Sequence, residues 1–306
     1  LGIGDRDCLD CGQRMYVVRQ TKNSSGDTLW FYYTDLPTAL AAAEDGDTVK
    51  LQDDIDNSNQ TACLTGNGKT VTLNLNGHTI NEGWIYVGID QDGKVINSSR
   101  LNITGSGGFD GMIGISAKGT LDLSDWDGGT IKTVDLSKSG NDECTLIVGE
   151  NMGTINTLSF YSWPSDKISN TKLTGGTYGS IPISMNSGVT SISFSDLLAP
   201  GYAFQYTDGS GFLPYDTKAL YENSTTTIRN IKVVECTTHV DLTGATDPDT
   251  GAAKGDNLCD YCNTALDGMA ASVTTAGTDA KTYYFSSPPR LTRWLTRRLT
   301  VPPSSC

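Results

Sequence analysis

The sequence is short of basic residues and contains no long hydrophobic run. Lys and Arg together number 22 against 35 Asp and Glu, which gives a formal net charge of −13. Proteins bind nucleic acids through phosphate contacts with a basic surface, so this balance argues against nucleic acid as a partner. A membrane-spanning helix needs about 18 or more consecutive apolar residues, and because the sequence has no such run we expect no membrane span.

Helix-forming patterns are almost absent, whereas glycine is abundant, with 34 residues. The clearest pattern lies within 68–80, where Val71, Leu73 and Leu75 alternate with polar residues. An alternation of period two is typical of a strand with one buried face. The phrase recurs at 49–51, 101–105, 120–124, 155–158 and 191–195. Spacings of roughly 20 to 30 residues fall in the range of repeat architectures.

These repeated strands predict an all-β fold, a right-handed parallel β-helix of about six or seven coils. A Greek-key sandwich is the alternative, but it predicts short Asn-Gly or Asp-Gly hairpins between adjacent strands, and the turns here separate unequal segments. One short helix is expected after Pro37, because Ala39–Ala43 favours helix and Gly46 ends it. This helix would cap the open N-terminal end of the solenoid.

An internal repeat divides the chain. Residues 4–11 correspond to 255–262, and Tyr32-Tyr33 to Tyr283-Tyr284, at a constant offset of 251 residues. A repeat of this length is a module rather than one coil. We therefore expect the C-terminal half of a Cys/His linker at 1–33, the β-helix at 34–235, a second Cys/His linker at 236–286, and a tail at 287–306. On this interpretation the sequence is a fragment that begins inside one module and ends inside the next.

The tail does not match the rest of the chain, because four arginines crowd into residues 287–306 after an otherwise acidic sequence. The repeat predicts a segment like Thr38–Leu51 here. A shifted reading frame of the coding DNA for 291–306 can spell such a segment, so we interpret the tail as a frameshift or cloning artefact. The alternative is a basic amphipathic tail that binds an acidic surface.

The most specific constellation is Cys236-x-x-His239 followed by Cys259-x-x-Cys262. Two close pairs of soft ligands, separated by a Gly/Asp/Thr-rich loop, are typical of a closed tetrahedral zinc site. Four protein ligands leave no open position, so this zinc would be structural. The alternative is a disulfide among the three cysteines. Cys63 and Cys144 stand alone and are expected to be buried as small hydrophobic residues.

Acidic residues gather at turns, and these are the candidates for catalysis or calcium binding. Side-chain oxygens two residues apart on a turn can hold calcium, although no complete calcium loop is present, and a carboxylate pair could hydrolyse glycosides. Few basic residues could assist, among them Lys132. The candidate carboxylates are Asp90, Asp92, Asp122, Asp125 and Asp127.

Aromatic residues in or beside turns suggest a different activity. Flat aromatic faces flanked by Asn, Asp and Thr suit sugar rings through apolar contact and hydrogen bonds. The alternative is that these rings pack beneath loops. The candidates are Trp84, Tyr86, Trp126, Tyr161, Trp163 and Tyr178.

Three phrases and the Cys/His cluster resemble one family. The phrases are 38–51, the strand 74–80 and 197–204. Together they resemble the repeat modules of gut Firmicutes cell-surface proteins that carry pectate-lyase-like β-helices. The resemblance implies a secreted or surface-anchored bacterial protein of this fold, and says little about substrate.

We expect a non-catalytic module that binds a polysaccharide or host glycan. A polysaccharide lyase or glycoside hydrolase and a structural spacer are the alternatives, because fold alone does not separate them. Carboxylates, or a carboxylate with Lys or Arg, meeting in one groove would favour the enzyme. An aromatic strip alone would favour binding. The sequence leaves the oligomeric state open.

Overall fold

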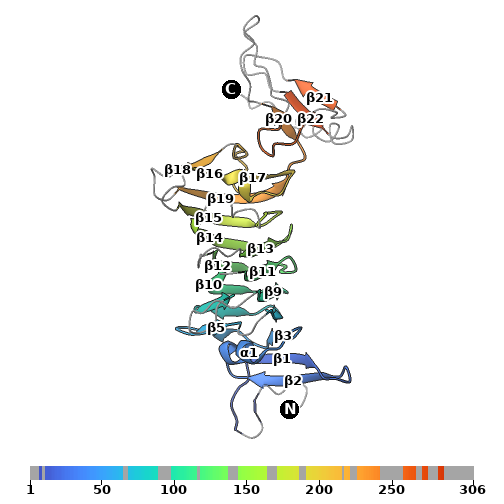
Figure 1. Ribbon diagram of the computed structural model, residues 1–306, viewed down its shortest axis with the longest axis vertical. Coiled ribbons are helices and arrows are strands. Elements are labelled where there is room, and N and C mark those ends of the chain that lie inside the picture. The colour runs from blue at the N-terminus through green and yellow to red at the C-terminus, as the bar shows by residue number, and fades with distance from the viewer. Residues whose placement is uncertain are drawn as a thin grey trace, which may run out of the picture.

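The structure is a computed structural model, shown in Figure 1, and it describes residues 7–8, 11–64, 68–88, 98–115, 118–136, 144–163, 171–185, 191–215, 217–220, 226–241, 258–266, 271–274 and 282–285. The strands of the solenoid lie across the long axis of the molecule and stack along it. The fold is all-β, a parallel β-solenoid of about 4 turns with one α-helix, as the strand pattern predicts. The tail at 287–306 lies outside the described residues.

One face of the solenoid is a seven-stranded sheet in which five consecutive strands are parallel. These are β3 (Thr48–Leu51), β6 (Thr70–Asn74), β9 (Arg100–Thr104), β11 (Thr120–Leu123) and β13 (Thr145–Val148). Equivalent apolar residues stack in register from coil to coil: Val71 lies opposite Leu101, and Leu121 opposite both Leu101 and Leu146. All four are buried. Burying each such side chain contributes about 1.5 to 3 kcal/mol, so this column is a main source of stability.

The second face is a ten-stranded sheet. Its strands are β4 (Ile55–Asp56), β5 (Thr61–Cys63), β7 (Thr79–Asn81), β8 (Trp84–Val87), β10 (Gly108–Ile115), β12 (Thr130–Asp135), β14 (Thr154–Trp163), β15 (Thr177–Met185), β19 (Thr226–Glu235) and β17 (Tyr202–Tyr206). Phe109, Ile131, Ile155 and Tyr178 form one inward column across β10, β12, β14 and β15. The space between this column and the apolar residues of the first sheet is the hydrophobic core.

The N-terminal end is closed by a hairpin and the helix. β1 (Val17–Lys22) pairs antiparallel with β2 (Thr28–Tyr33) and with β3. Helix α1 (Leu36–Ala42) begins after Asp35, whose carboxylate accepts a hydrogen bond from the Thr38 backbone N–H at 2.8 Å, and it buries Leu36, Ala39 and Leu40. Buried Arg19 of β1 forms an ion pair with buried Asp47 at 3.1 Å. The expected capping helix is therefore confirmed, and the hairpin lies beyond it.

The C-terminal end is closed by antiparallel pairs. β15 pairs antiparallel with β19, and β19 with β17. β16 (Ser191–Ser193), which precedes the 3₁₀ helix Phe194–Leu197, pairs antiparallel with β18 (Lys218–Leu220). The prediction of six or seven coils is wrong, because these end strands pair antiparallel and add no coil. The phrase at 191–195 forms no coil, and the phrase at 155–158 lies in the second sheet rather than the first.

A small sheet follows the solenoid. It contains β20 (His239–Asp241), β22 (Thr282–Phe285) and β21 (Ala271–Thr274), with β22 in the middle. Within the described ranges, no helix combines the length and hydrophobicity required to cross a membrane.

Close stacking of coils leaves no room for side chains at certain glycines. Gly129 has a φ of +96°, and a Cβ there would lie 2.0 Å from the Gly107 carbonyl oxygen of the coil below. We expect Gly129→Ala to destabilise the protein by about 3 kcal/mol, because strain and a backbone clash add. The matched variant is Gly209→Ala, where φ is +78° and no atom lies within 4 Å of the added Cβ.

That control should cost only about 1 kcal/mol, from backbone strain alone. Urea unfolding monitored by circular dichroism measures both free energies of unfolding. Equal losses for the two variants would show that the contact between coils does not limit the size of the residue at position 129.

Candidate functional site

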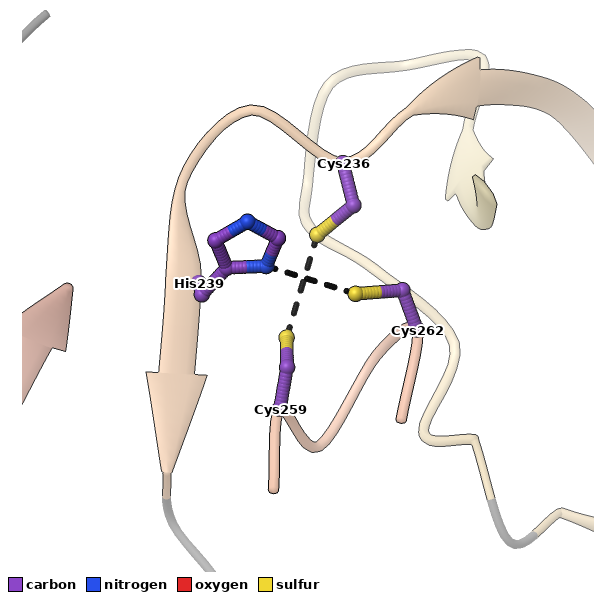
Figure 2. A group of neighbouring side chains, drawn as sticks. All are labelled: Cys236, His239, Cys259 and Cys262. Atoms are coloured by element: carbon purple, nitrogen blue, oxygen red, sulfur yellow. Dashed lines mark hydrogen bonds between the residues drawn. The ribbon is translucent and has the colours of Figure 1, made fainter. Parts of the chain in front are cut away.

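Cys236, His239, Cys259 and Cys262 converge on one point, as Figure 2 shows. Their ligand atoms all lie within 4.8 Å of one another, and all four residues are buried. The Sγ atoms of Cys236 and Cys259 are 3.8 Å apart, and Cys262 Sγ lies 3.3 Å from His239 Nδ1. Among the residues that the structure describes, this is the one group of three or more His, Cys, Asp or Glu side chains close enough to hold a metal ion.

The two halves of this cluster come from different local structures. Cys236 directly follows β19, and His239 begins β20. Cys259 and Cys262 lie on a tight turn, in which the Cys259 N–H donates to the Thr264 carbonyl and the Asn263 N–H donates to the Cys259 carbonyl. Asn263 has a φ of +56°, a conformation that asparagine adopts more easily than most residues. We call residues 258–265 the C-terminal knuckle.

The solenoid holds the cluster from below. The Cys236 N–H donates to the Gly201 carbonyl at 2.8 Å, and the Tyr215 N–H donates to the Asp260 carbonyl at 2.7 Å. The rings of Phe212 and Tyr261 stack with centroids 5.0 Å apart. The knuckle is therefore fixed to the segment that follows β17.

These residues fit a zinc ion. Tetrahedral zinc has sulfur ligands at about 2.3 Å and nitrogen ligands at about 2.0 Å, which places two sulfurs about 3.8 Å apart and a sulfur about 3.5 Å from a nitrogen. The observed 3.8 Å and 3.3 Å agree with this arrangement. None of the three cysteines is in a disulfide. Three thiolates and one imidazole fill all four positions, so a metal here would hold the fold rather than bind substrate.

Hydrogen bonds within the cluster shift the pKa values of its members. Hydrogen bonding from Cys236, and then from Cys262, lowers the pKa of the Cys259 thiol. Hydrogen bonds to Cys259 and Cys262 raise the pKa of His239 to about 9. A divalent cation would displace the protons that these side chains share, and the protons would pass to solvent.

The described acidic candidates are dispersed. Buried Asp122 forms an ion pair with Arg100 and accepts hydrogen bonds from the backbone N–H and hydroxyl of Ser124, so its carboxylate serves the fold. Asp125 and Asp127 are exposed on the following turn. They form no metal-binding group among the described residues, which gives calcium no support there. Asp90 and Asp92 lie outside the described residues.

Two of the aromatic candidates are not on the surface, which corrects the expected exposure. Tyr178 is fully buried in the inward column opposite Ile155 and Ile231, and its hydroxyl donates to the Gly175 carbonyl. Trp126 is 1% exposed, and its indole N–H donates to the Gly107 carbonyl at 3.0 Å. In both cases the ring is buried in the core, and its polar group donates a hydrogen bond to a backbone carbonyl. The side chains of Tyr161 and Trp163 lie outside the described residues.

Trp84 is exposed, with 40% of its surface accessible, and it lines a groove on the second sheet. Two cavities of about 370 and 270 Å³ share Asp110 and Lys132 and together form this flank groove. Lys132 Nζ lies 3.3 Å from Asp110 Oδ1, and both side chains are more than half exposed. The remaining polar side chains along the groove are Asn59, Glu82, Thr79, Thr130 and Thr133.

Sequence analysis missed Asp110, Glu82 and Asn59. Asp110 and Lys132 meet because β10 and β12 lie side by side, and they are 22 positions apart in the chain. No local sequence motif indicates that the two residues are close. The pair could be predicted only from the order in which the strands stack and from their register.

The proximity of Tyr86 and Asp135 is a second feature that the sequence did not reveal. Tyr86 lies opposite Gly114, and Gly114 opposite Asp135, across three adjacent strands. Burial raises the pKa of Asp135, with Ser159 opposing the shift through a hydrogen bond. The Oδ1 atom of Asp135 is buried and has no hydrogen-bond partner. The ionised carboxylate of Asp135 therefore destabilises the folded state.

Comparison with protein-family models, with curated proteins and with solved structures found no match for this chain.

Zinc binding should depend on the four converging residues. We expect Cys259→Ser to abolish one tightly bound zinc per chain and to lower the thermal midpoint of unfolding, because a metal that binds only the folded state stabilises it. Cys144→Ser, at a buried cysteine outside the cluster, should retain the zinc. Native mass spectrometry measures the stoichiometry, and zinc retained by Cys259→Ser would exclude the site.

Asp135 should make stability depend on pH. A carboxyl group whose pKa is raised in the folded state contributes stability below its unfolded pKa, and this contribution is lost as pH rises through the folded value. We expect Asp135→Asn to stabilise the protein at pH 7 by about 1 kcal/mol, the low end of the range for an unsatisfied buried polar atom, with no gain in acid.

Asp122→Asn is the matched control, since it breaks the ion pair with Arg100 and should destabilise at pH 7. Urea unfolding at several pH values measures both effects. A loss of stability for Asp135→Asn at pH 7 would contradict the assigned direction.

Proposed function

We propose that this protein is a non-catalytic module that binds a glycan chain along the flank groove. The observation that carries the proposal is Trp84, a flat and exposed aromatic ring beside Glu82 and the Asp110–Lys132 pair. Apolar contact with a sugar face and hydrogen bonds to its hydroxyls need this combination of side chains. Because the groove crosses adjacent coils, it suits an extended chain better than a single sugar.

The net charge of the chain restricts the class of glycan that the groove could bind. The chain carries a net charge of −13, and Lys132 is already paired with Asp110. A polyanionic uronate would be repelled by such a surface, whereas a neutral glycan would not. The partner we propose is therefore a neutral polysaccharide or host glycan, met by a secreted or surface-anchored protein, as the family resemblance implies.

A polysaccharide-degrading enzyme is the second candidate, and one observation favours it. Asp110, Glu82 and Lys132 bring two carboxyl groups and an amine into the groove that Trp84 lines. Acid–base catalysis usually works with groups whose pKa values are shifted by burial or by neighbouring charge. The Asp110 and Lys132 side chains are more than half exposed, and this exposure favours binding over catalysis.

The test is retention on insoluble or immobilised polysaccharides together with an assay for new chain ends. We expect retention on a neutral polymer without new ends, and a loss of about tenfold in affinity for Trp84→Ala, which corresponds to an aromatic contact of about 1.4 kcal/mol.

Trp30→Ala is the matched control, since Trp30 is 52% exposed on β2, away from the groove. It should bind as the unchanged protein does. New chain ends that disappear in Asp110→Asn would instead establish the enzyme. Equal retention of Trp84→Ala and the unchanged protein would overturn the flank groove as the binding site.

A further inference from the structure

The turn that carries Cys8 and Cys11 has the same backbone structure as the C-terminal knuckle. The Cys8 N–H donates to the Gln13 carbonyl and the Gly12 N–H donates to the Cys8 carbonyl, each at 2.7 Å. Gly12 has a φ of +70°, and Asp7 forms an antiparallel bridge with Arg14. Each feature has a counterpart 251 positions later. The Cys259 N–H donates to the Thr264 carbonyl, and the Asn263 N–H donates to the Cys259 carbonyl. Asn263 also has a positive φ, and Leu258 forms an antiparallel bridge with Ala265. We call residues 7–8 and 11–14 the N-terminal knuckle.

The two knuckles differ in what covers them. Cys259 and Cys262 are 1% and 5% exposed, whereas Cys8 is half-buried and Cys11 is exposed. In the C-terminal knuckle, the metal-binding group is completed by a Cys-x-x-His segment that runs directly into β20. Cys8 and Cys11 belong to no such group among the described residues.

The strands beside the knuckles differ in the same way. β22 contains Tyr283 and Tyr284, the counterparts of Tyr32 and Tyr33 in β2, and it pairs with β21 on one edge and with β20 on the other. β2 pairs with β1 on one edge, and within the described strands it ends its sheet. The edge of β2 that corresponds to the β20 position is therefore open in this part of the chain.

The exposed residues of β2 indicate that this edge receives a partner. Leu29, Trp30, Phe31 and Tyr32 are consecutive and between 39% and 52% exposed. They are four of the five large hydrophobic residues exposed in the described chain. Edge strands of soluble proteins are usually protected by charge, proline or a covering element, and a bare apolar edge is a template for strand addition.

We propose that the N-terminal knuckle and the open edge of β2 form the acceptor half of a metal-linked strand-addition site. Its occupant is an extended segment that carries Cys-x-x-His at the start of a strand, the chemistry that residues 236–241 supply to the C-terminal knuckle. Two thiolates from Cys8 and Cys11, with one thiolate and one imidazole from the partner, complete a tetrahedral zinc site. Ligand thiols release their protons to solvent as the ion binds.

The internal comparison also fixes the register of the added strand. In the C-terminal sheet, His239 lies opposite Tyr284, Val240 opposite Tyr283 and Asp241 opposite Thr282. The partner's histidine should therefore lie opposite Tyr33, and the next two residues opposite Tyr32 and Phe31. Main-chain hydrogen bonds would supply affinity, while the metal would select a Cys-x-x-His segment over other strands.

The experiment uses the full chain with one equivalent of zinc already bound, and a synthetic peptide of residues 233–241. Cobalt is added as the probe, because tetrahedral Co²⁺ with thiolate ligands absorbs visibly, and zinc binds such sites more tightly than cobalt and stays in place. We expect one further equivalent of tetrahedral cobalt that requires the peptide. The double variant Cys8→Ser/Cys11→Ser should lose it and retain the bound zinc.

The Val240 carbonyl accepts from the Asp260 N–H, so the ladder hydrogen bonds to β22 come from the two neighbouring residues of β20, His239 and Asp241. A peptide with Asp241→Pro therefore provides the matched control, since it keeps both ligands but lacks one N–H donor of the strand pairing. It should bind at least about tenfold more weakly, because proline removes a ladder hydrogen bond. No peptide-dependent cobalt would overturn the proposal. Cobalt that binds equally without peptide would also overturn it and indicate a four-cysteine site between two copies of this chain. Equal binding of the proline peptide would show that β2 takes no part.

Discussion

The structure depends on the hydrogen-bonded register between successive coils. Because Val71, Leu101, Leu121 and Leu146 occupy equivalent positions, each strand buries its apolar residues directly above those of the strand before it. The same register forces backbone against backbone at the turns, which is why Gly129 tolerates no Cβ above Gly107. One geometric rule thus sets both the apolar core and the glycine positions, and changing the register of one coil would disturb every coil stacked upon it.

The register also builds the surfaces. Trp84, Asp110 and Lys132 come from three strands, and only stacking brings them into one groove. The Cys/His cluster is assembled differently. Its four ligands come from a strand end, a strand start and one tight turn, and the last coil holds them through backbone hydrogen bonds and the Phe212–Tyr261 stack. The groove residues and the Cys/His cluster therefore occupy separate parts of the chain, so that disrupting the cluster would leave the groove intact.

The sequence predicted what repeats or lies close together in the chain. Alternating residues at 71–75 predicted the strands, Pro37 and Ala39 predicted the helix, and paired spacing predicted the convergence of Cys236 with His239 and of Cys259 with Cys262. It could not predict contacts set by stacking. The predicted number of coils was too high because antiparallel end strands have the same sequence pattern as parallel ones. Trp126 and Tyr178 were expected on the surface because nothing in the neighbouring sequence shows whether an aromatic residue beside a turn points inward.

The stacking direction has a mechanical consequence. The strands lie across the long axis, so the hydrogen bonds between coils run along it, as the arrangement in Figure 1 implies. A tensile load applied between the two ends would pass through every interface between coils in series, and each interface would carry the whole force. The molecule would then extend at its weakest interface first, peeling coils apart one at a time. In such a column, resistance to pulling is a property of a single layer, however tall the stack becomes.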